Sequence, residues 1–492
     1  MTRLTRCIAA LVLVASAACG ARLDHAELRS ARLRAMGTGG GATAGGTSAG
    51  ATGAATASSD AAATAGETAA AATSGAAGAA SSTSGGTSGA ATSTGKGTTA
   101  PSGGTSSATA ACAADVSSSD PGVSAKEIHF GGVSTTGGPV PGIFKGARDG
   151  VSAFFAYINS QGGICGRSLK LDSLDDNLDA SQNQHDYETL ITKTLGIVGG
   201  FSPVDEGGGK VLSDHPDVPD VAFTATKSRL ANPNNFSPQP LKFPGFRLGP
   251  MTYEKQLFGD AVIKKMAFFT EDVQPARDAT EGQMAAARSL GYDFVYTRIT
   301  EPTDADFTAD VSNMKNKGVK GIFMFGDVGQ IARIAAAMKA QNFSVPLAAW
   351  SSNVYDTQFI ANSQGGSEGA TIDIQQAMFL GEDAAVPEVA LFDQWVNRVG
   401  GKPDLYAVYS WAAARMMVQA LQQAGGKPTR AAIMSALKTV HRFDANGLLA
   451  PADPAGKVPP TCWILVRVKN GKFVRDPATP SGFRCEPGGY FG

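Results

Sequence analysis

The fold is decided by a strand–helix–strand pattern at residues 128–176, which read IHFGGVSTTGGPVPGIFKGARDGVSAFFAYINSQGGICGRSLKLDSLDD. Ile128–Val133 and Leu169–Leu174 are short apolar runs of strand length, and apolar residues recur at helical spacing in Gly150–Ser160 between them. A helix that connects two such strands is typical of a parallel β-α-β unit. The stretch therefore predicts an α/β fold.

The same alternation continues along the chain, interrupted by a proline-rich passage from Pro233 to Pro250. Further strands are predicted at Ile197–Phe201, Val221–Thr226, Met266–Thr270, Asp293–Ile299, Gly321–Phe325 and Pro346–Trp350. Helices are predicted at Gln182–Thr194, Thr280–Ser289, Thr308–Lys317, Gln330–Gln341, Pro387–Val399, Leu405–Ala424 and Arg430–Leu437. Two successive series of this kind predict two doubly wound lobes, each with a parallel sheet covered by helices.

The chain ends in a predicted hairpin, in which Asn470-Gly471 joins the runs Cys462–Lys469 and Lys472–Arg475. Because two cysteines bracket the hairpin, a Cys462–Cys485 disulfide is expected. Cys112 and Cys165 would then form a second disulfide, the alternative being that one of the two pairs stays reduced.

The N-terminus has the pattern of a secretory signal peptide, predicted at residues 1–18, because Arg3 and Arg6 precede the apolar stretch Ile8–Ala18. Two cleavage sites compete. One is an A-x-A site at residues 15–17; the other resembles a bacterial lipobox, which would leave a lipid on Cys19 as the mature N-terminus. Lipidation leaves an even set of four cysteines for disulfides in an oxidising compartment, and we therefore favour it.

Residues 19–115 are predicted to be a low-complexity tether that joins this lipid anchor to the folded part. Between Gly41 and Ala110 almost every residue is Ala, Gly, Ser or Thr, so the segment has no side chains with which to build a core. A flexible chain of this length spans roughly 45 Å. The alternative to a tether is a low-complexity insertion that has no functional role.

Charge and motifs exclude several classes of protein. Lys and Arg number 42 against 43 Asp and Glu, without a basic cluster, which argues against a nucleic-acid partner. Gly207–Lys210 lacks the remaining residues of a P-loop, and the 5 histidines lack the spacing of metal ligands. Asp175-Asp176 are adjacent residues at a strand end and would point to opposite faces. The sequence therefore predicts no catalytic residues, no metal and no cofactor.

Small hydroxyl-bearing residues follow two of the predicted strands in the first lobe: Ser202, Thr224 and Thr226. Ligands of open α/β sheets bind beyond the carboxyl ends of the strands, where such hydroxyls could hold a carboxylate or amide. For any single residue, a role as a helix cap is the alternative.

Four segments form a recognisable set: NSQGGICGR at residues 159–167, the acidic pair Asp175-Asp176, ADFT at residues 305–308, and the strand Gly321–Asp327. Together they resemble the periplasmic type I solute-binding proteins of the branched-chain amino-acid family. The similarity extends from about residue 125 to residue 470, nearly all of the folded part.

The resemblance implies two Rossmann-like, doubly wound lobes, joined by three crossovers, that close on a ligand like a hinged clamp. Lobe 1 would comprise residues 116–248 and 375–441, and lobe 2 residues 249–374 and 442–492. It also implies a monomer that delivers a small molecule to an ABC permease. The expected ligand-binding residues are Phe144, Ser202, Thr224, Thr226, Asp327, Val328, Trp350 and Ser351.

The sequence departs from the family pattern at three places. Ser351 stands near the position of the acid that holds the ligand ammonium, Pro275-Ala276 replace a Tyr-Gly pair, and Cys165 replaces Asn. Asp327 is the nearby acid that remains. The ligand is therefore not restricted to α-amino acids; amides, urea-like compounds and aromatic acids are alternatives. A ligand-sensing module that regulates a partner, and a secreted hydrolase, are the other functions considered.

Overall fold

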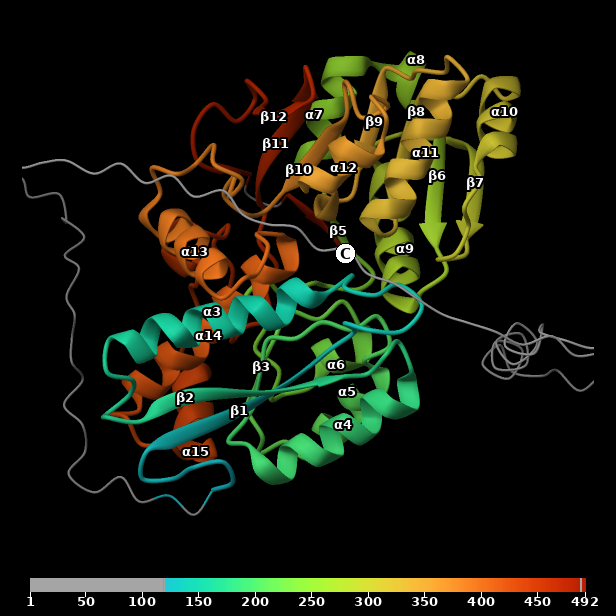
Figure 1. Cartoon of the computed structure of the whole chain (residues 1–492). Coiled ribbons are helices and arrows are strands. Elements are labelled where there is room, and N and C mark those ends of the chain that lie inside the picture. The colour runs from blue at the N-terminus through green and yellow to red at the C-terminus, as the bar shows by residue number, and fades with distance from the viewer. Residues whose placement is uncertain (1–117, 119, 487–488) are drawn as a thin grey trace, which may run out of the picture. The chain divides into compact units, whose positions relative to one another are not determined.

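The computed structural model describes residues 118, 120–486 and 489–492 (Figure 1). The predicted signal peptide, Cys19, the tether and Cys112 lie outside these residues. Within the described residues, no helix is long and apolar enough to cross a membrane.

The first sheet has four parallel strands in the order β2-β1-β3-β4. Its strands are β1 (Glu127–Ser134), β2 (Ser168–Asp175), β3 (Ile197–Val198) and β4 (Asp220–Val221). The helices between and after them are α3 (Lys145–Ser160), α4 (Ala180–Lys193), α5 (Glu206–Asp214) and α6 (Lys227–Ala231). Three later helices return to this sheet: α13 (Pro387–Arg398) and α14 (Leu405–Gln423) pack against α3, and α15 (Arg430–Leu437) packs against α14. Helices therefore cover both faces (Figure 1).

The second sheet has the strand order β12-β11-β10-β9-β8-β6-β7, with β13 paired to β11. Its strands are β6 (Met266–Glu271), β7 (Phe294–Thr300), β8 (Gly321–Phe325), β9 (Leu347–Trp350), β10 (Thr371–Ile374), β11 (Cys462–Lys469), β12 (Lys472–Arg475) and β13 (Arg484–Cys485). The helices of this region are α7 (Gly249–Phe258), α8 (Asp260–Ile263), α9 (Gln274–Ser289), α10 (Thr308–Asn316), α11 (Val328–Ala340) and α12 (Thr357–Asn362).

Strand β6 shows why this sheet is covered on both faces. Met266 and Phe268 pack into one buried apolar cluster, whereas Ala267 and Phe269 pack into another. Because successive side chains of a strand point to opposite faces, a continuous apolar run needs helices on both. The predicted α/β fold with two doubly wound lobes is thus confirmed.

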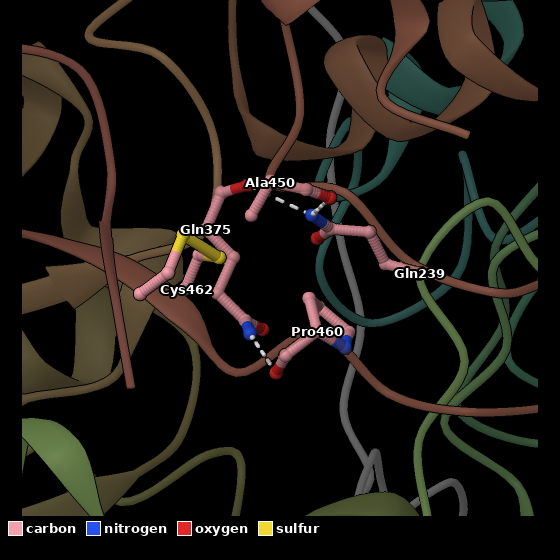
Figure 2. The surroundings of a disulfide bond; sticks show 6 residues. Gln239, Gln375, Ala450, Pro460 and Cys462 are labelled. Carbon is pink, nitrogen blue, oxygen red and sulfur yellow. Dashed lines mark hydrogen bonds between the residues drawn. A yellow bond between two sulfur atoms is a disulfide. The ribbon is translucent and has the colours of Figure 1, made fainter. Parts of the chain in front are cut away.

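The chain crosses between the two sheets three times: after β4, after β10 and before β11. Gln239 of the first crossover donates to the carbonyl oxygens of Gln375 (2.7 Å) and Ala450 (3.5 Å), which belong to the second and third (Figure 2). Gln375 in turn donates to the carbonyl oxygen of Pro460 (3.0 Å). A further pair of short strands, β5 (Phe246–Arg247) and β14 (Tyr490–Phe491), lies beside the first crossover.

The C-terminal hairpin has the predicted bounds, and Asn470 and Gly471 adopt φ values of +53° and +65°, as a two-residue turn of this type requires. The predicted Cys462–Cys485 disulfide is confirmed (Figure 2). Cys165 is also disulfide-bonded, but its predicted partner lies outside the described residues.

Two predicted strands are much shorter than expected: β3 ends at Val198 rather than at Phe201, and β4 ends at Val221 rather than at Thr226. After β3, Gly199 and Gly200 turn the chain with positive φ values. The Thr224 hydroxyl accepts a hydrogen bond from the Thr226 amide (3.1 Å). Such a local bond replaces the ladder bonds of a strand.

Candidate ligand-binding site

A cavity of about 220 Å³ lies where residues following the strands of both sheets meet the crossovers. The first sheet contributes residues after β1, β3 and β4, the second sheet residues after β6, β8 and β9, and the crossovers contribute Arg247, Gln375 and Pro459. Most of the lining side chains are apolar or aromatic. A concave apolar pocket with a few polar groups is the usual form of a small-molecule site.

An aromatic wall on the first-lobe side is formed by Phe144, Phe201, Phe223, Tyr406 and Tyr409. The ring centres of Phe144, Phe201 and Tyr406 are 4.7–4.8 Å apart, and the ring of Phe223 stacks on Tyr409 at 4.0 Å. The wall is therefore continuous and internally packed.

Two glycines bring Phe201 to this wall. Gly199 and Gly200 follow β3 with φ values of +60° and +80°. A Cβ atom on Gly200 would lie 2.2 Å from the carbonyl oxygen of Val133. The chain can therefore turn this tightly against β1 only without side chains there.

The opposite side of the cavity carries two carboxyl groups, those of Glu271 and Asp327. Glu271 ends β6, and its Oε2 accepts from the Asp327 amide (2.8 Å). Asp327 caps α11, because its Oδ1 accepts from the Gln330 amide (3.0 Å). Glu271 is 7% exposed. Burial, with the nearby charge of Asp327 as a further cause, raises the pKa of Glu271 to about 7.

Arg247 is the single basic residue among the described residues that line the cavity. Its guanidinium pairs with Asp373 and donates to Gln375 Oε1 (3.3 Å). Glu254 also lines the cavity, and burial raises its pKa well above the usual value, which favours its uncharged form. The positive charge of the lining is thus already neutralised by Asp373.

Four of the eight predicted binding residues line the cavity: Phe144, Asp327, Trp350 and Ser351. Trp350 is 3% exposed, and its indole N–H has no acceptor among the described residues. Such a buried donor can bind an acceptor on a ligand. The Ser351 hydroxyl donates to Asn353 (2.5 Å), whose amide donates to the Gly326 carbonyl oxygen (2.9 Å).

The other four predicted residues, Ser202, Thr224, Thr226 and Val328, are not among the lining residues. Ser202 is 3% exposed and accepts from the Thr135 hydroxyl (3.2 Å) and the Val204 amide (3.1 Å). Val328 is the first residue of α11.

Thr224 and Thr226 are fully buried in a polar network around Arg229. The Thr224 hydroxyl donates to Asp205 (2.9 Å) and lies 2.9 Å from that of Thr226. The buried guanidinium of Arg229 donates to Asp205 (3.1 Å) and to Asp220 (2.7 and 3.0 Å). These hydroxyls therefore hydrogen-bond to buried polar groups inside the lobe and do not face the cavity.

Sequence reasoning missed Glu271 and Tyr406. Glu271 is a polar residue directly after an apolar strand, so the rule that selected Ser202 could have selected it. Tyr406 belongs to α14 and packs against Phe201, although more than half of the described chain separates the two residues in sequence. No local sequence pattern indicates this contact.

Within the described residues no group of three or more His, Cys, Asp or Glu side chains could hold a metal ion. The Asp175-Asp176 pair has a structural role. Asp176 is buried and accepts from Thr135 (2.6 Å) and Asn183 (2.8 Å), whereas Asp175 accepts from the Thr136 amide (2.9 Å).

The sequence model of a family described as periplasmic binding protein matches residues 127–472. The chain belongs to this family. A periplasmic binding protein of this family binds a solute. No curated protein sequence is significantly similar to the chain.

Solved structures of type I periplasmic binding proteins share the fold. A fatty acid ABC transporter substrate-binding protein from Thermomonospora curvata is 19% identical with a TM-score of 0.62, over 72% of this chain and 92% of its own. A branched-chain amino acid ABC transporter protein from Thermus thermophilus with bound valine is 15% identical with a TM-score of 0.63, over 74% and 98%. The substrate-binding protein of a branched-chain amino acid transporter from Streptococcus pneumoniae, in complex with isoleucine, is 14% identical with a TM-score of 0.59, over 71% and 100%.

Proposed function

We propose that this periplasmic binding protein is the extracytoplasmic solute receptor of an ABC importer. It captures a small, largely apolar ligand by closure of two lobes and delivers it unchanged to the permease. The observation that carries the proposal is an apolar cavity with lining residues from both sheets and from the crossovers. A ligand that contacts both sides stabilises the closed arrangement of the lobes.

The moving parts are the lobes assigned above, residues 116–248 with 375–441 and residues 249–374 with 442–492. The proposed ligand contacts are Phe144, Asp327, Trp350 and Ser351, which face the cavity, joined by Glu271 and the aromatic wall. One structure with this fold is a fatty acid ABC transporter substrate-binding protein, and two others hold valine or isoleucine, so the fold accepts apolar bodies with different polar ends.

The lining supports binding without catalysis. Its polar groups are carboxyls, amides, hydroxyls, the guanidinium of Arg247 and the indole N–H of Trp350, and no histidine or cysteine of the described residues belongs to it. The hydroxyl of Ser351, for example, donates to the side chain of Asn353 rather than to a carboxylate.

We further propose that residues 1–18 are removed during export, that a lipid on Cys19 anchors the chain to the membrane, and that residues 19–115 tether a monomer within reach of its permease. Support comes from the basic and apolar N-terminus and from the even number of cysteines left after lipidation.

Native mass spectrometry of the full chain, purified without denaturation, tests these statements together. We expect a bound small molecule and a mature mass that begins at Cys19 with added lipid. A panel of apolar amines, acids, alcohols and amino acids should raise the melting temperature as RT ln(1 + [L]/Kd), without turnover. If neither a co-purified molecule nor any stabilising compound is found, the proposed function is wrong.

A further inference from the structure

The charges that face the cavity are unevenly distributed. Asp373 neutralises Arg247, and Glu254 favours its uncharged form, so the carboxyl groups of Glu271 and Asp327 remain without a cationic partner in the lining. A buried carboxylate without a cation is costly. The charge of Arg333 on α11 acts on Glu271 from outside the lining, but no cation among the described residues of the lining pairs with either carboxyl group.

Glu271 is oriented so that it can accept a bond from a ligand. More than nine-tenths of the residue is buried, yet it lines the cavity. Its Oε2 is held by the Asp327 amide, which fixes the carboxyl group, whereas Oε1 accepts no hydrogen bond from the described residues. A fixed acceptor with one free oxygen is suited to an N–H donor of a ligand.

The aromatic wall faces these carboxyl groups. Tyr406, Glu271 and Asp327 line the same cavity. Burial raises the pKa of Tyr406, and the charges of Asp404, Glu271 and Asp327 raise it further. Phe144 packs edge-on against Tyr406 at 4.7 Å. Aromatic faces attract cations, and most strongly where water is excluded.

The hydroxyls that would hold a ligand carboxylate are engaged elsewhere. Ser202, Thr224 and Thr226 hydrogen-bond inside the first lobe and do not line the cavity. The lining thus offers two carboxyl groups to a cation and an aromatic wall to an apolar body, whereas an acceptor on a ligand finds the single indole N–H of Trp350 and an arginine, Arg247, that is already paired with Asp373.

We propose that the ligand is an apolar organic cation, an amine on a hydrocarbon or aromatic body, whose ammonium group is bound by Glu271 and Asp327 beside Tyr406. This inference rests on the proposed solute-binding function and names the chemical class that the cavity selects. A site for such a cation differs from a site that binds a zwitterionic amino acid or a fatty acid.

Three compounds with one carbon skeleton test the inference: 3-phenylpropylamine, 3-phenylpropan-1-ol and 3-phenylpropionate, titrated calorimetrically into the full chain at about pH 8. The amine should bind about tenfold more tightly than the alcohol, and the carboxylate most weakly, because only the amine forms a charge-assisted bond.

Variants separate the charge from the shape of the site. Glu271→Gln and Asp327→Asn keep size, and Asn still caps α11. Each should reduce the affinity for the amine about tenfold and change that for the alcohol less than about twofold. Glu281→Gln removes the same charge from an exposed position of α9 outside the lining and should change neither affinity.

Tightest binding of 3-phenylpropionate, or amine binding unaffected by Glu271→Gln, overturns the inference and leaves the proposed function intact. Failure of all three compounds to bind also overturns the inference, while the proposed function is then decided separately by the co-purified molecule and the wider panel.

Discussion

Glu271, the last residue of β6, is buried in the folded protein, so its carboxyl group is largely removed from water. It also lies beside the charged side chain of Asp327. Both conditions disfavour its ionised form, while the charge of Arg333 acts in the opposite direction. Its pKa is raised from 4.5 to about 7. The folded protein therefore binds this proton more tightly than the unfolded chain does, which links stability to pH.

The sign of this linkage gives a prediction for the ligand-free protein. The protonated carboxyl group of Glu271 contributes fully to the free energy of unfolding below about pH 4.5, and this contribution is lost as the pH rises through about 7. Glu271→Gln cannot ionise, so at pH 8 it should be more stable than the parent by on the order of 2–3 kcal/mol, and about equal at pH 4.5. Urea unfolding at both pH values measures this difference. A variant no more stable than its parent at pH 8 would contradict the assignment.

Glu271 and Thr224 illustrate what single residues reveal before a structure is known. Both are polar and follow apolar strands, a position that predicts a ligand site in an α/β sheet. Glu271 lines the cavity, whereas Thr224 bonds to Asp205 in the network of Arg229. The local sequence pattern places both residues near strand ends. Whether such a side chain faces the cavity or the protein interior depends on residues that are distant in the chain.

At the scale of elements, the stretch at residues 159–167 is a connection that sets where β2 begins. The Asn159 side chain accepts from the Leu169 amide (2.8 Å) and donates to the Leu169 carbonyl oxygen (2.9 Å), as a neighbouring strand would. Ile164 and Arg167 exchange backbone hydrogen bonds across a tight turn. The family resemblance of this segment thus has a structural basis rather than a ligand-binding one.

Two neighbouring glycines in this connection allow a matched prediction. Both have positive φ, +96° at Gly162 and +72° at Gly163. A Cβ atom on Gly162 would meet nothing within 4 Å, whereas one on Gly163 would lie 2.0 Å from the Arg167 carbonyl oxygen. Gly162→Ala should cost about 1 kcal/mol for the left-handed backbone alone, and Gly163→Ala about 3 kcal/mol or more. Equal losses in urea unfolding would show that the turn relaxes around the added methyl group.

Elements with strong local signals were predicted well, and those shaped by tertiary bonds were not. The hairpin at residues 462–475 has the predicted bounds because Asn-Gly and β-type runs act locally. The prediction of a strand at Val221–Thr226 was wrong beyond Val221, because the Thr226 amide donates a hydrogen bond to the Thr224 side chain instead of to a neighbouring strand. No periodicity of the sequence reports such a side-chain bond.

At the scale of the whole molecule, the three crossovers decide how the two lobes respond to each other. Gln239 joins all of them, because its amide donates to Gln375 and Ala450 and its oxygen accepts from Gln376 (3.2 Å). Gln376 also donates to the hydroxyl of Tyr409 (2.8 Å), a residue of the aromatic wall. A buried network therefore connects the hinge with the ligand cavity.

Gln239→Ala should weaken this connection, because it leaves the Gln375 carbonyl oxygen and one Gln376 amide N–H buried with fewer partners. Each such group costs about 1–3 kcal/mol. We expect a lower urea midpoint and a smaller m-value, since lobes that are less tightly joined unfold less cooperatively. Gln422→Ala, an exposed glutamine on α14, is the matched control and should leave both quantities unchanged. If Gln239→Ala unfolds at the same midpoint and with the same slope as its parent, the crossovers are held by packing alone, and closure does not depend on this glutamine.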